Sequence, residues 1–404
     1  MRKKENLIAV AIVLLSVALR VYLLFKPGYG NDLGSFIRWG QAASKGVWSL
    51  FSGNYSAWID YPPLVPILSG WWLNLVSALG IKNIDLGFKI LPTIFEALLT
   101  IVTTLVVYKS KVRYRIWLLA AVIISPGLAL VSAGWGQMDA MLALMILLGY
   151  LLIPRSLYFS TLLLFVALMI KPQAIIAVGI YFLYLFFSRG IKSFALQAAI
   201  FVALFLIPTA IFKFVGQTNF LYPYTQSIGN YDNASLNAFN LWWLIFATRS
   251  WAVKDTAQVA GVSYRLIGLW LLFIFELPAL IYLKAKARQV PQLILTVAYS
   301  YLAFFVLPTE IHERYLFPAV ALMAIAALLE KKIFWVYLAL SATLLLNCFA
   351  VLQSVYPQFE FLKFNLLGGN WTRAVALINI LALFYLAYWL ATKSFKKTER
   401  VKLK

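Results

Sequence analysis

The sequence predicts an all-α integral membrane protein with about twelve transmembrane helices. Of the 404 residues, 63% are hydrophobic and only 12% are charged, whereas soluble domains average roughly 45–50% and about 25%. The apolar residues also form repeated long runs, and about 20 such residues cross the hydrocarbon of a bilayer. Because backbone groups in lipid must pair within the segment, these runs are predicted to be helices.

The predicted spans are the apolar runs between short polar connections. They cover residues of about 7–25, 86–108, 116–133, 139–153, 157–170, 172–187, 193–214, 264–283, 291–308, 315–330, 333–350 and 374–392. The first run is too long for a signal peptide and lacks a small-residue cleavage site, so we expect a retained helix. No internal repeat or low-complexity linker divides the chain, which is predicted to be one membrane domain, residues 1–404.

Basic residues occupy alternate connections and predict the orientation. They are Arg2, Lys3, Lys4, Lys109, Lys111, Arg113, Arg115, Arg155, Arg189, Lys192, Lys284, Lys286, Arg288, Lys331, Lys332 and the tail from Lys393. By the positive-inside rule these connections and both termini are cytoplasmic, in the plasma (inner) membrane. The large connections at about 26–85, 215–263 and 351–373 are then extracytoplasmic. The net charge of +21 reflects this topology rather than nucleic-acid binding.

One apolar segment, residues 64–79, decides the parity of this topology. If it spanned the bilayer, the basic loop before the third helix would lie outside. Its prolines, its length of about 16 residues and its Trp71–Trp72 pair favour a helix that lies at the membrane interface. We therefore predict interfacial helices in the first external loop.

Polar motifs cluster at the predicted external helix ends. They are Gly30-Asn31-Asp32, Asp60-Tyr61-Pro62-Pro63, Trp135-Gly136-Gln137-Met138-Asp139, Lys171-Pro172-Gln173, Asn237 to Trp243, and Glu310-Ile311-His312-Glu313-Arg314-Tyr315. All six fall on one side of a topology that was set from basic residues on the other side. Any chemistry is therefore expected on the extracytoplasmic face.

In this order, the motifs resemble the GT-C superfamily of membrane glycosyltransferases, which take sugars from polyprenyl-phosphate carriers. The resemblance covers most of the chain and is closest to prokaryotic mannosyltransferase-like members. It implies a GT-C-type helix bundle and an inverting transfer of a hexose, with mannose the expected sugar. The acceptor would be a hydroxyl of a glycan, a lipid or a protein.

The resemblance and the chemistry together suggest roles for four residues. A carboxylate can take the acceptor proton, and Asp32 stands where the family's first-loop acid falls; the alternative is a helix cap or Asx-turn. Cations stabilise a departing phosphate, and Arg314, His312 and Lys171 are the candidates. Snorkelling to the interface is the alternative for Arg314 and Lys171, and an ordinary loop hydrogen bond for His312. The hypothesis requires Asp32 and the cations to converge at one membrane surface.

Further polar and aromatic residues of the motifs are expected to bind the sugar or the acceptor. They are Asp60, Tyr61, Gln137, Asp139, Gln173, Asn237, Asn240, Trp243 and Glu313. Structural alternatives exist for some: Asp139 suits a helix N-terminus, Asp60 precedes a proline turn, and Trp243 fits an aromatic belt.

Four ionisable residues, Arg20, Lys89, Glu96 and Glu276, lie within or beside predicted spans. Such groups are functional candidates by default, but an intramembrane ion pair, for example Arg20 with Glu96, would instead fix helix packing. Glu96 and Glu276 could also belong to a proton-coupled path. A flippase or secondary transporter of lipid-linked sugars is thus the alternative class.

The sequence requires no cofactor. A single cysteine and a single histidine exclude cysteine-based and multi-histidine metal sites, although a divalent cation on carboxylates is not excluded. No phosphate-binding Gly-rich loop is present. The expected partners are a polyprenyl-phosphate sugar, its acceptor and membrane lipids.

Overall fold

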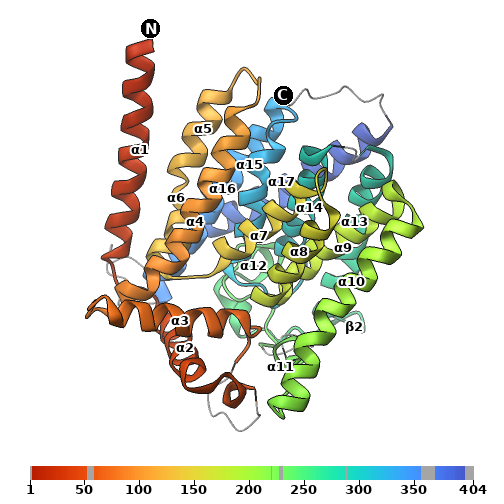
Figure 1. Ribbon diagram of the computed structural model, residues 1–404. Helices are drawn as coiled ribbons and strands as arrows, with labels where there is room; N and C mark the ends of the chain where they lie inside the picture. Colours follow the sequence, from red (N-terminus) through yellow and green to blue (C-terminus); the bar gives the residue numbers. More distant parts are fainter. Residues whose placement is uncertain are drawn as a thin grey trace.

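The computed structural model describes residues 2–51, 59–219, 221–226, 231–286, 289–355 and 369–395. This part of the chain is almost entirely helical (Figure 1). Its α-helices are α1 Arg2–Leu24, α2 Gly30–Leu50, α3 Leu64–Ala78, α4 Ile84–Tyr108, α5 Arg115–Ile124, α6 Pro126–Ala129, α7 Asp139–Leu152, α8 Leu157–Ile170, α9 Ile175–Arg189, α10 Ile191–Ala210, α11 Tyr222–Gln226, α12 Leu241–Phe246, α13 Tyr264–Lys286, α14 Val290–Val306, α15 Phe317–Ala326, α16 Lys331–Val355 and α17 Trp371–Ser394.

Short 3-10 or π-helical segments and one hairpin complete the described elements. The segments are η1 Leu130–Trp135, η2 Pro172–Ala174, η3 Ile211–Val215, η4 Ala247–Trp251 and η5 Glu313–Leu316. The hairpin pairs β1 Gln258–Val259 antiparallel to β2 Val262–Ser263. Of the predicted connection 351–373, residues 356–368 lie outside the described residues, as does the basic tail from residue 396.

Seven segments of the described chain are long and apolar enough to cross a membrane. They are Ile84–Tyr108, Arg115–Trp135, Pro172–Arg189, Ile191–Val215, Tyr264–Lys286, Lys331–Ser354 and Trp371–Ser394, and each coincides with a predicted span. Large apolar side chains on their outer faces are exposed, such as Leu206 at 58% and Phe273 at 59%. A surface of this kind needs lipid rather than water, so the fold is that of a multi-pass helical membrane protein.

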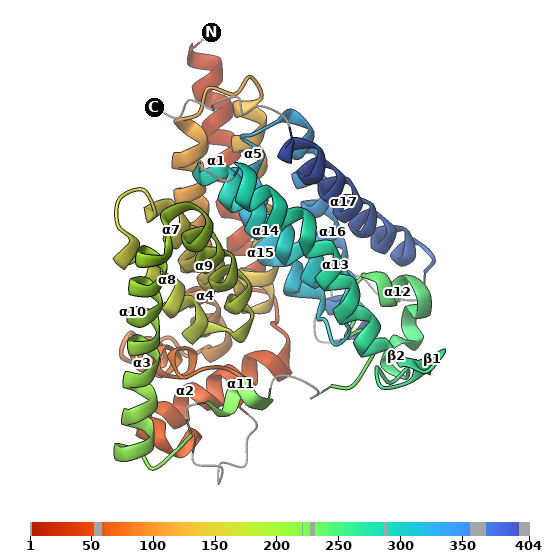
Figure 2. The same cartoon turned by 90° about the vertical axis from the view of Figure 1, so that its right-hand side faces the viewer.

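Helices α2 and α3 lie across one end of the bundle, away from the end where α1 begins (Figure 1, Figure 2). With 15 residues, α3 is about 22 Å long, which is too short for a hydrocarbon core of about 30 Å. The two helices cross closely at Gly40 and Gly70, since a Cβ on Gly70 would lie 2.7 Å from the Gly40 carbonyl oxygen. The segment predicted to be interfacial thus packs against α2 at the end of the bundle.

The expected ion pair between Arg20 of α1 and Glu96 of α4 is confirmed. Nε and Nη2 of Arg20 donate to the two carboxylate oxygens of Glu96, both at 2.7 Å. Nearby, Nζ of Lys89 donates to the carbonyl oxygens of Leu23 (3.1 Å) and Lys26 (2.5 Å), which closes the C-terminal end of α1. Polar contacts therefore attach α1, which is otherwise largely exposed, to the bundle.

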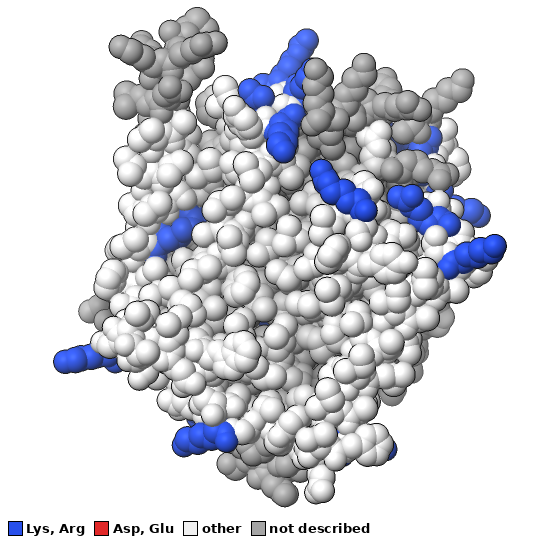
Figure 3. All heavy atoms as spheres, viewed as in Figure 1, with Lys and Arg blue, Asp and Glu red and all other residues white. Residues whose placement is uncertain are grey.

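Two further observations concern charge. Glu276 of α13 accepts a hydrogen bond from Oγ of Ser300 on α14 at 2.8 Å, so it links neighbouring helices. Figure 3 shows most of the Lys and Arg side chains on its face at the end where α4 meets α5, above a largely uncharged band. At this same end Lys393 of α17 pairs with Glu330 at 3.1 Å. The basic connections thus gather at the end of the bundle opposite to α2 and α3.

Candidate functional site

Asp32, in the first turn of α2, is held by donors from two other parts of the chain. Nε1 of Trp135 donates to its Oδ2 at 2.9 Å, and Nε2 of Gln137 donates to the same oxygen. Nη2 of Arg314 lies 3.6 Å from that oxygen, while Tyr61 orients Gln137 by donating to its Oε1 at 3.3 Å. The convergence of Asp32 and Arg314, which the hypothesis requires, is therefore present.

A local break in helical geometry brings the two donors to Asp32. The π-helical segment η1 ends at Trp135, and Gly136 follows in the left-handed region with φ of 92°. A Cβ at Gly136 would lie 3.1 Å from Leu33 Cδ1 and 3.2 Å from Lys89 Cγ, so only glycine fits without strain. The Trp-Gly-Gln motif thus has a physical reason, and π-helical turns of this kind are frequent at functional sites.

Arg314 is a buried cation with unused hydrogen-bonding capacity. Its Nη1 donates to Oε1 of Glu313 at 2.8 Å, and its guanidinium carbon lies 5.5 Å from the Trp135 ring. Burial opposes the charge, but Asp32 and Glu313 hold the Arg314 pKa well above its usual value. Its Nε has no hydrogen-bond partner among the described residues. Glu313, expected to bind sugar, is 1% exposed and instead orients Arg314.

The surroundings of His312 favour a neutral imidazole over a cation. Its ring lies edge-on between Tyr231 and Tyr315, with centroids 5.4 and 5.3 Å away. Burial lowers the His312 pKa well below its usual value, and Arg314 and Lys171 lower it further. The expectation of a third cation is therefore corrected: near pH 7 this imidazole can donate a hydrogen bond but carries no charge.

Asn237 supports the loop that carries His312. The two residues form an isolated backbone bridge, and Asn237 has a positive φ of 65°. Its Oδ1 accepts a hydrogen bond from Nε1 of Trp251 at 2.6 Å, and its carbonyl oxygen accepts one from Nδ2 of Asn347 at 2.8 Å. These contacts place Asn237 behind the loop and not at the cavity.

Asn240 and Trp243, also expected to bind sugar, are fully buried. Oδ1 of Asn240 accepts hydrogen bonds from the backbone N–H groups of Trp242 and Trp243, both at 3.1 Å, and so caps α12. The Trp243 ring packs on Phe239, with centroids 5.0 Å apart. Neither residue lines the cavity described below, and their contacts are those of a scaffold.

Lys171 and Asp139 form a buried ion pair, with Nζ 2.9 Å from Oδ1. Burial lowers the Lys171 pKa, whereas Asp139 acts to raise it. The ammonium lies 5.2 Å from the Tyr61 ring centroid. In the described part of the chain, Oδ2 of Asp139 and Oε1 of Gln173 have no hydrogen-bond partner. Buried polar atoms rarely remain unpaired, so these atoms indicate a place for a polar ligand.

Asp60 provides a second carboxylate. Burial raises its pKa from 3.8 to about 6, the Asp32 charge raises it as well, and Arg314 and Lys171 act in the opposite direction. A carboxyl pKa of about 6 lies nearer to neutrality than the ordinary value, as suits a group that exchanges protons.

A cavity of about 550 Å³ joins several of these groups to an apolar channel. Asp32 is not among its lining residues but lies 3.6 Å from Arg314, which is. Its polar lining consists of Asp60, Tyr61, Lys171, Gln173, Tyr231, Arg265, Thr309, Glu310, His312, Arg314 and Tyr315. Its apolar lining comes from α8, α9, α10, α13 and α14: Leu168, Ile175, Ile176, Phe205, Leu269 and Phe304. Ile175 and Leu269 are 57% and 51% exposed, so this end opens on the outer surface of the bundle.

One cluster beside the cavity was not predicted from the sequence. Nε of Arg265 donates to Oδ2 of Asp255 at 2.7 Å, and Nη2 lies 2.9 Å from Oε1 of Glu310. Oγ1 of Thr309 also donates to Asp255, at 3.0 Å. Arg265 opens an apolar run and looks like an interface anchor in the sequence, where nothing indicates its pairing with Glu310, the first residue of the 310–315 motif.

A scan of the sequence against protein-family models gives no match, and a search of the curated proteins gives none either. The described residues contain no group of three or more His, Cys, Asp or Glu that could hold a metal ion. The chemistry open to the site follows from its side chains: two carboxylates for proton transfer, two cations for an anionic group, and a neutral imidazole.

Proposed function

We propose that this protein is a GT-C-type inverting glycosyltransferase that moves a hexose, with mannose the expected sugar, from a polyprenyl phosphate to an acceptor hydroxyl. One observation carries the proposal: the charged side chains Asp60, Lys171 and Arg314 line the same cavity as apolar side chains of α8, α9, α10, α13 and α14. This combination matches an amphiphile whose phosphate meets the cations and whose hydrocarbon chain runs between helices into lipid.

The proposed reaction assigns tasks to Asp32, Arg314, Lys171 and His312. The acceptor oxygen attacks the anomeric carbon, and Asp32 takes the hydroxyl proton. The bond between the anomeric carbon and the phosphate oxygen breaks, and the bonding pair leaves with the polyprenyl phosphate. Arg314 and Lys171 stabilise the charge that develops on that phosphate, with His312 as a neutral donor. Attack from the opposite face inverts the anomeric centre.

The fit of Arg314 to a phosphate is favourable for two reasons. A guanidinium presents paired N–H donors that match two phosphate oxygens, and Nε of Arg314 is still unpaired among the described residues. Its position between Asp32 and Glu313 also keeps the cation beside the expected base.

We further propose the finer topology. The shorter apolar helices α1, α7, α8 and α14, together with the predicted span 315–330, would complete twelve spans. Both termini would be cytoplasmic and the site extracytoplasmic, in the plasma membrane. The gathering of basic connections at the end opposite to the site supports this orientation.

A flippase or transporter of lipid-linked sugars remains the competing class, because the apolar channel would also admit a lipid in transit. Transporter sites, however, lie near the middle of the membrane. The polar lining here joins the connection between α2 and α3, at Asp60 and Tyr61, to the 309–315 loop at one end of the bundle.

The test is sugar transfer by the purified protein in lipid vesicles. Radiolabelled mannose, glucose and arabinose on polyprenyl phosphate are supplied with lipid, glycan and peptide acceptors, and the anomeric configuration of the product is determined. The proposal expects an inverted product from at least one donor. Translocation of the lipid-linked sugar across the vesicle bilayer without any transfer would contradict it and favour the flippase.

A further inference from the structure

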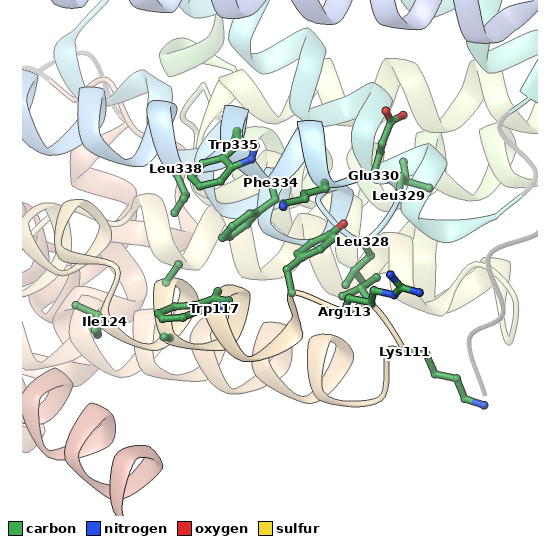
Figure 4. A pocket seen from close by; sticks show the side chains of 15 residues that line it. Lys111, Arg113, Trp117, Ile124, Leu328, Leu329, Glu330, Phe334, Trp335 and Leu338 are labelled. Carbon is green, nitrogen blue, oxygen red and sulfur yellow. The ribbon is translucent and has the colours of Figure 1, made fainter. Parts of the chain in front are cut away.

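A second, larger cavity lies at the basic end of the bundle and shares no residue with the candidate site. It is a groove of about 1220 Å³ between the connection that precedes α5 and the start of α16. Figure 4 shows this groove, with side chains from both segments facing each other. We refer to it as the α5–α16 groove.

The floor of the groove is a fixed contact between its two sides. The Tyr114 hydroxyl donates to the carbonyl oxygen of Ala327 at 2.6 Å. The Tyr114 ring stacks on Phe334, with centroids 5.3 Å apart and planes at 25°. Because both sides are joined, the groove is a preformed feature of the fold.

The groove has an apolar half and a charged half. In Figure 4, Trp117, Ile124, Trp335 and Leu338 lie toward one side, and Lys111, Arg113 and Glu330 toward the other. The two tryptophans are 72% and 58% exposed. Exposed tryptophans beside basic residues are typical of the membrane–water interface, where an amphiphile meets both environments.

The charged half has positive charge that the described residues do not neutralise. Lys111, Arg113 and Lys331 line the groove, and no carboxylate in the described ranges forms an ion pair with them. Glu330, the acidic lining residue, is already engaged by Lys393 at 3.1 Å and by Nε1 of Trp389 at 2.9 Å. The free positive charge calls for an anionic partner.

The spacing of these residues fits the length scale of a lipid headgroup. Arg113 precedes Trp117 by four residues, and Lys331 precedes Trp335 by four. Lys331 and Trp335 both lie in α16, where four residues rise about 6 Å, so this cation stands about one turn from its tryptophan. Arg113 lies in the turn that leads directly into α5, the helix that carries Trp117. This arrangement places a phosphate at the cations and hydrocarbon against the indoles.

We propose that the α5–α16 groove binds one anionic phospholipid of the membrane leaflet at the basic end of the bundle. Its phosphate headgroup contacts Lys111, Arg113 and Lys331, and an acyl chain lies against Trp117 and Trp335. Charge argues against two other occupants, the C-terminal tail and a second copy of this chain. Residues 396–404 contain five Lys or Arg and one Glu, so the tail would add positive charge to a positive groove. A second copy would bring a second set of the same basic residues.

Native mass spectrometry of the delipidated full chain tests the site. Phosphatidylglycerol and phosphatidylcholine with identical acyl chains are titrated separately. We expect one retained phosphatidylglycerol per chain and little phosphatidylcholine. A basic residue near an anionic lipid surface contributes about fivefold to binding, so Lys111→Gln/Arg113→Gln/Lys331→Gln should weaken retention by on the order of 100-fold. Lys82→Gln, which neutralises an exposed lysine between α3 and α4, is the matched control.

The apolar half has its own comparison. Trp117→Ala/Trp335→Ala should weaken the retention of long-chain phosphatidylglycerol more than that of a short-chain form. Trp71→Ala on α3 is the control, since Trp71 is 72% exposed, as is Trp117. Sugar transfer and the melting temperature are measured on the same samples to show that each variant is folded.

Four results would overturn the proposal. Equal retention of the two phospholipids would remove the headgroup contact, and so would unchanged retention in the triple variant. Preferential retention of polyprenyl phosphate would replace the phospholipid by the carrier lipid. Conversion of a dimer to a monomer by the tryptophan substitutions, with lipid retention unchanged, would assign the groove to a second copy. The glycosyltransferase proposal does not depend on this groove.

Discussion

The substitution Asp32→Asn gives the sharpest test of the proposed base. Both donors to Asp32, Nε1 of Trp135 and Nε2 of Gln137, share its Oδ2. The amide oxygen of asparagine can accept both hydrogen bonds, and its NH2 group would then take the place of Oδ1. In the described chain Oδ1 accepts no hydrogen bond, so the substitution removes the charge and the basicity with little change in packing.

The expected magnitude follows from these contacts. A positioned general base contributes roughly 10²- to 10⁴-fold, which corresponds to about 3–5 kcal/mol of the activation free energy. Arg314 keeps its partner Glu313 at 2.8 Å, and the Asp32 side chain is 25% exposed. The loss of folding stability should therefore stay within about 1 kcal/mol.

The assay is transfer of radiolabelled hexose at saturating donor and acceptor, with the melting temperature as the measure of folding. We expect kcat to fall at least 100-fold while the melting temperature stays within a few degrees of wild type. Transfer at the wild-type rate in folded Asp32→Asn protein would refute the assignment of Asp32 as the base. If kcat fell by a similar factor in Asp60→Asn but not in Asp32→Asn, Asp60 would be assigned as the base.

Three further predictions concern buried charges. Arg20→Ala leaves Glu96 unpaired and should cost about 3–5 kcal/mol of stability. Replacing both residues by leucine should recover most of that stability; no recovery would show that the unpaired Glu96 charge is not the cause of the loss. Because the folded protein raises the Asp60 pKa from 3.8 to about 6, it holds this proton more tightly than the unfolded chain, and stability falls as the pH rises between these values. Asp60→Asn should therefore raise the melting temperature at pH 7.5 but hardly at pH 4, and an equal rise at both would contradict the shift. Lys171→Met leaves Asp139 buried without a cation, so adding Asp139→Asn should restore the melting temperature but not sugar transfer; restored transfer would exclude Lys171 as a phosphate ligand.

Several features of the fold could be predicted because their cause is local or pairwise. The long apolar runs fix the candidate spans, and two opposite charges in apolar surroundings, Arg20 and Glu96, have few alternatives to each other. The segment 64–79 could be assigned to the membrane interface from its prolines, its short length and its Trp71–Trp72 pair, and in the structure it lies at the end of the bundle (Figure 1). The convergence of Asp32 and Arg314 could be expected from the predicted topology, since the connections that carry the two residues lie on the same side of the membrane.

Other features depend on neighbours that the sequence does not place. The charge of His312 depends on its burial beside Arg314, which is a property of the assembled site. Asn240 and Trp243 look like sugar ligands as a motif, yet the structure uses one to cap a helix and the other to fill the interior. The Arg265 cluster was missed because its partners come from separate connections.

The way in which α1 is attached has a consequence for biosynthesis. Arg20 enters the membrane with the first helix, 76 residues before its partner Glu96 is made. Because chains are synthesised at roughly 5–20 residues per second, the Arg20 guanidinium has no counter-ion from Glu96 for several seconds. Its place near the end of α1 lets the side chain reach the polar surface during that interval. Arrival of α4 then offers the carboxylate, so that the order of synthesis itself directs the first helix to its neighbour.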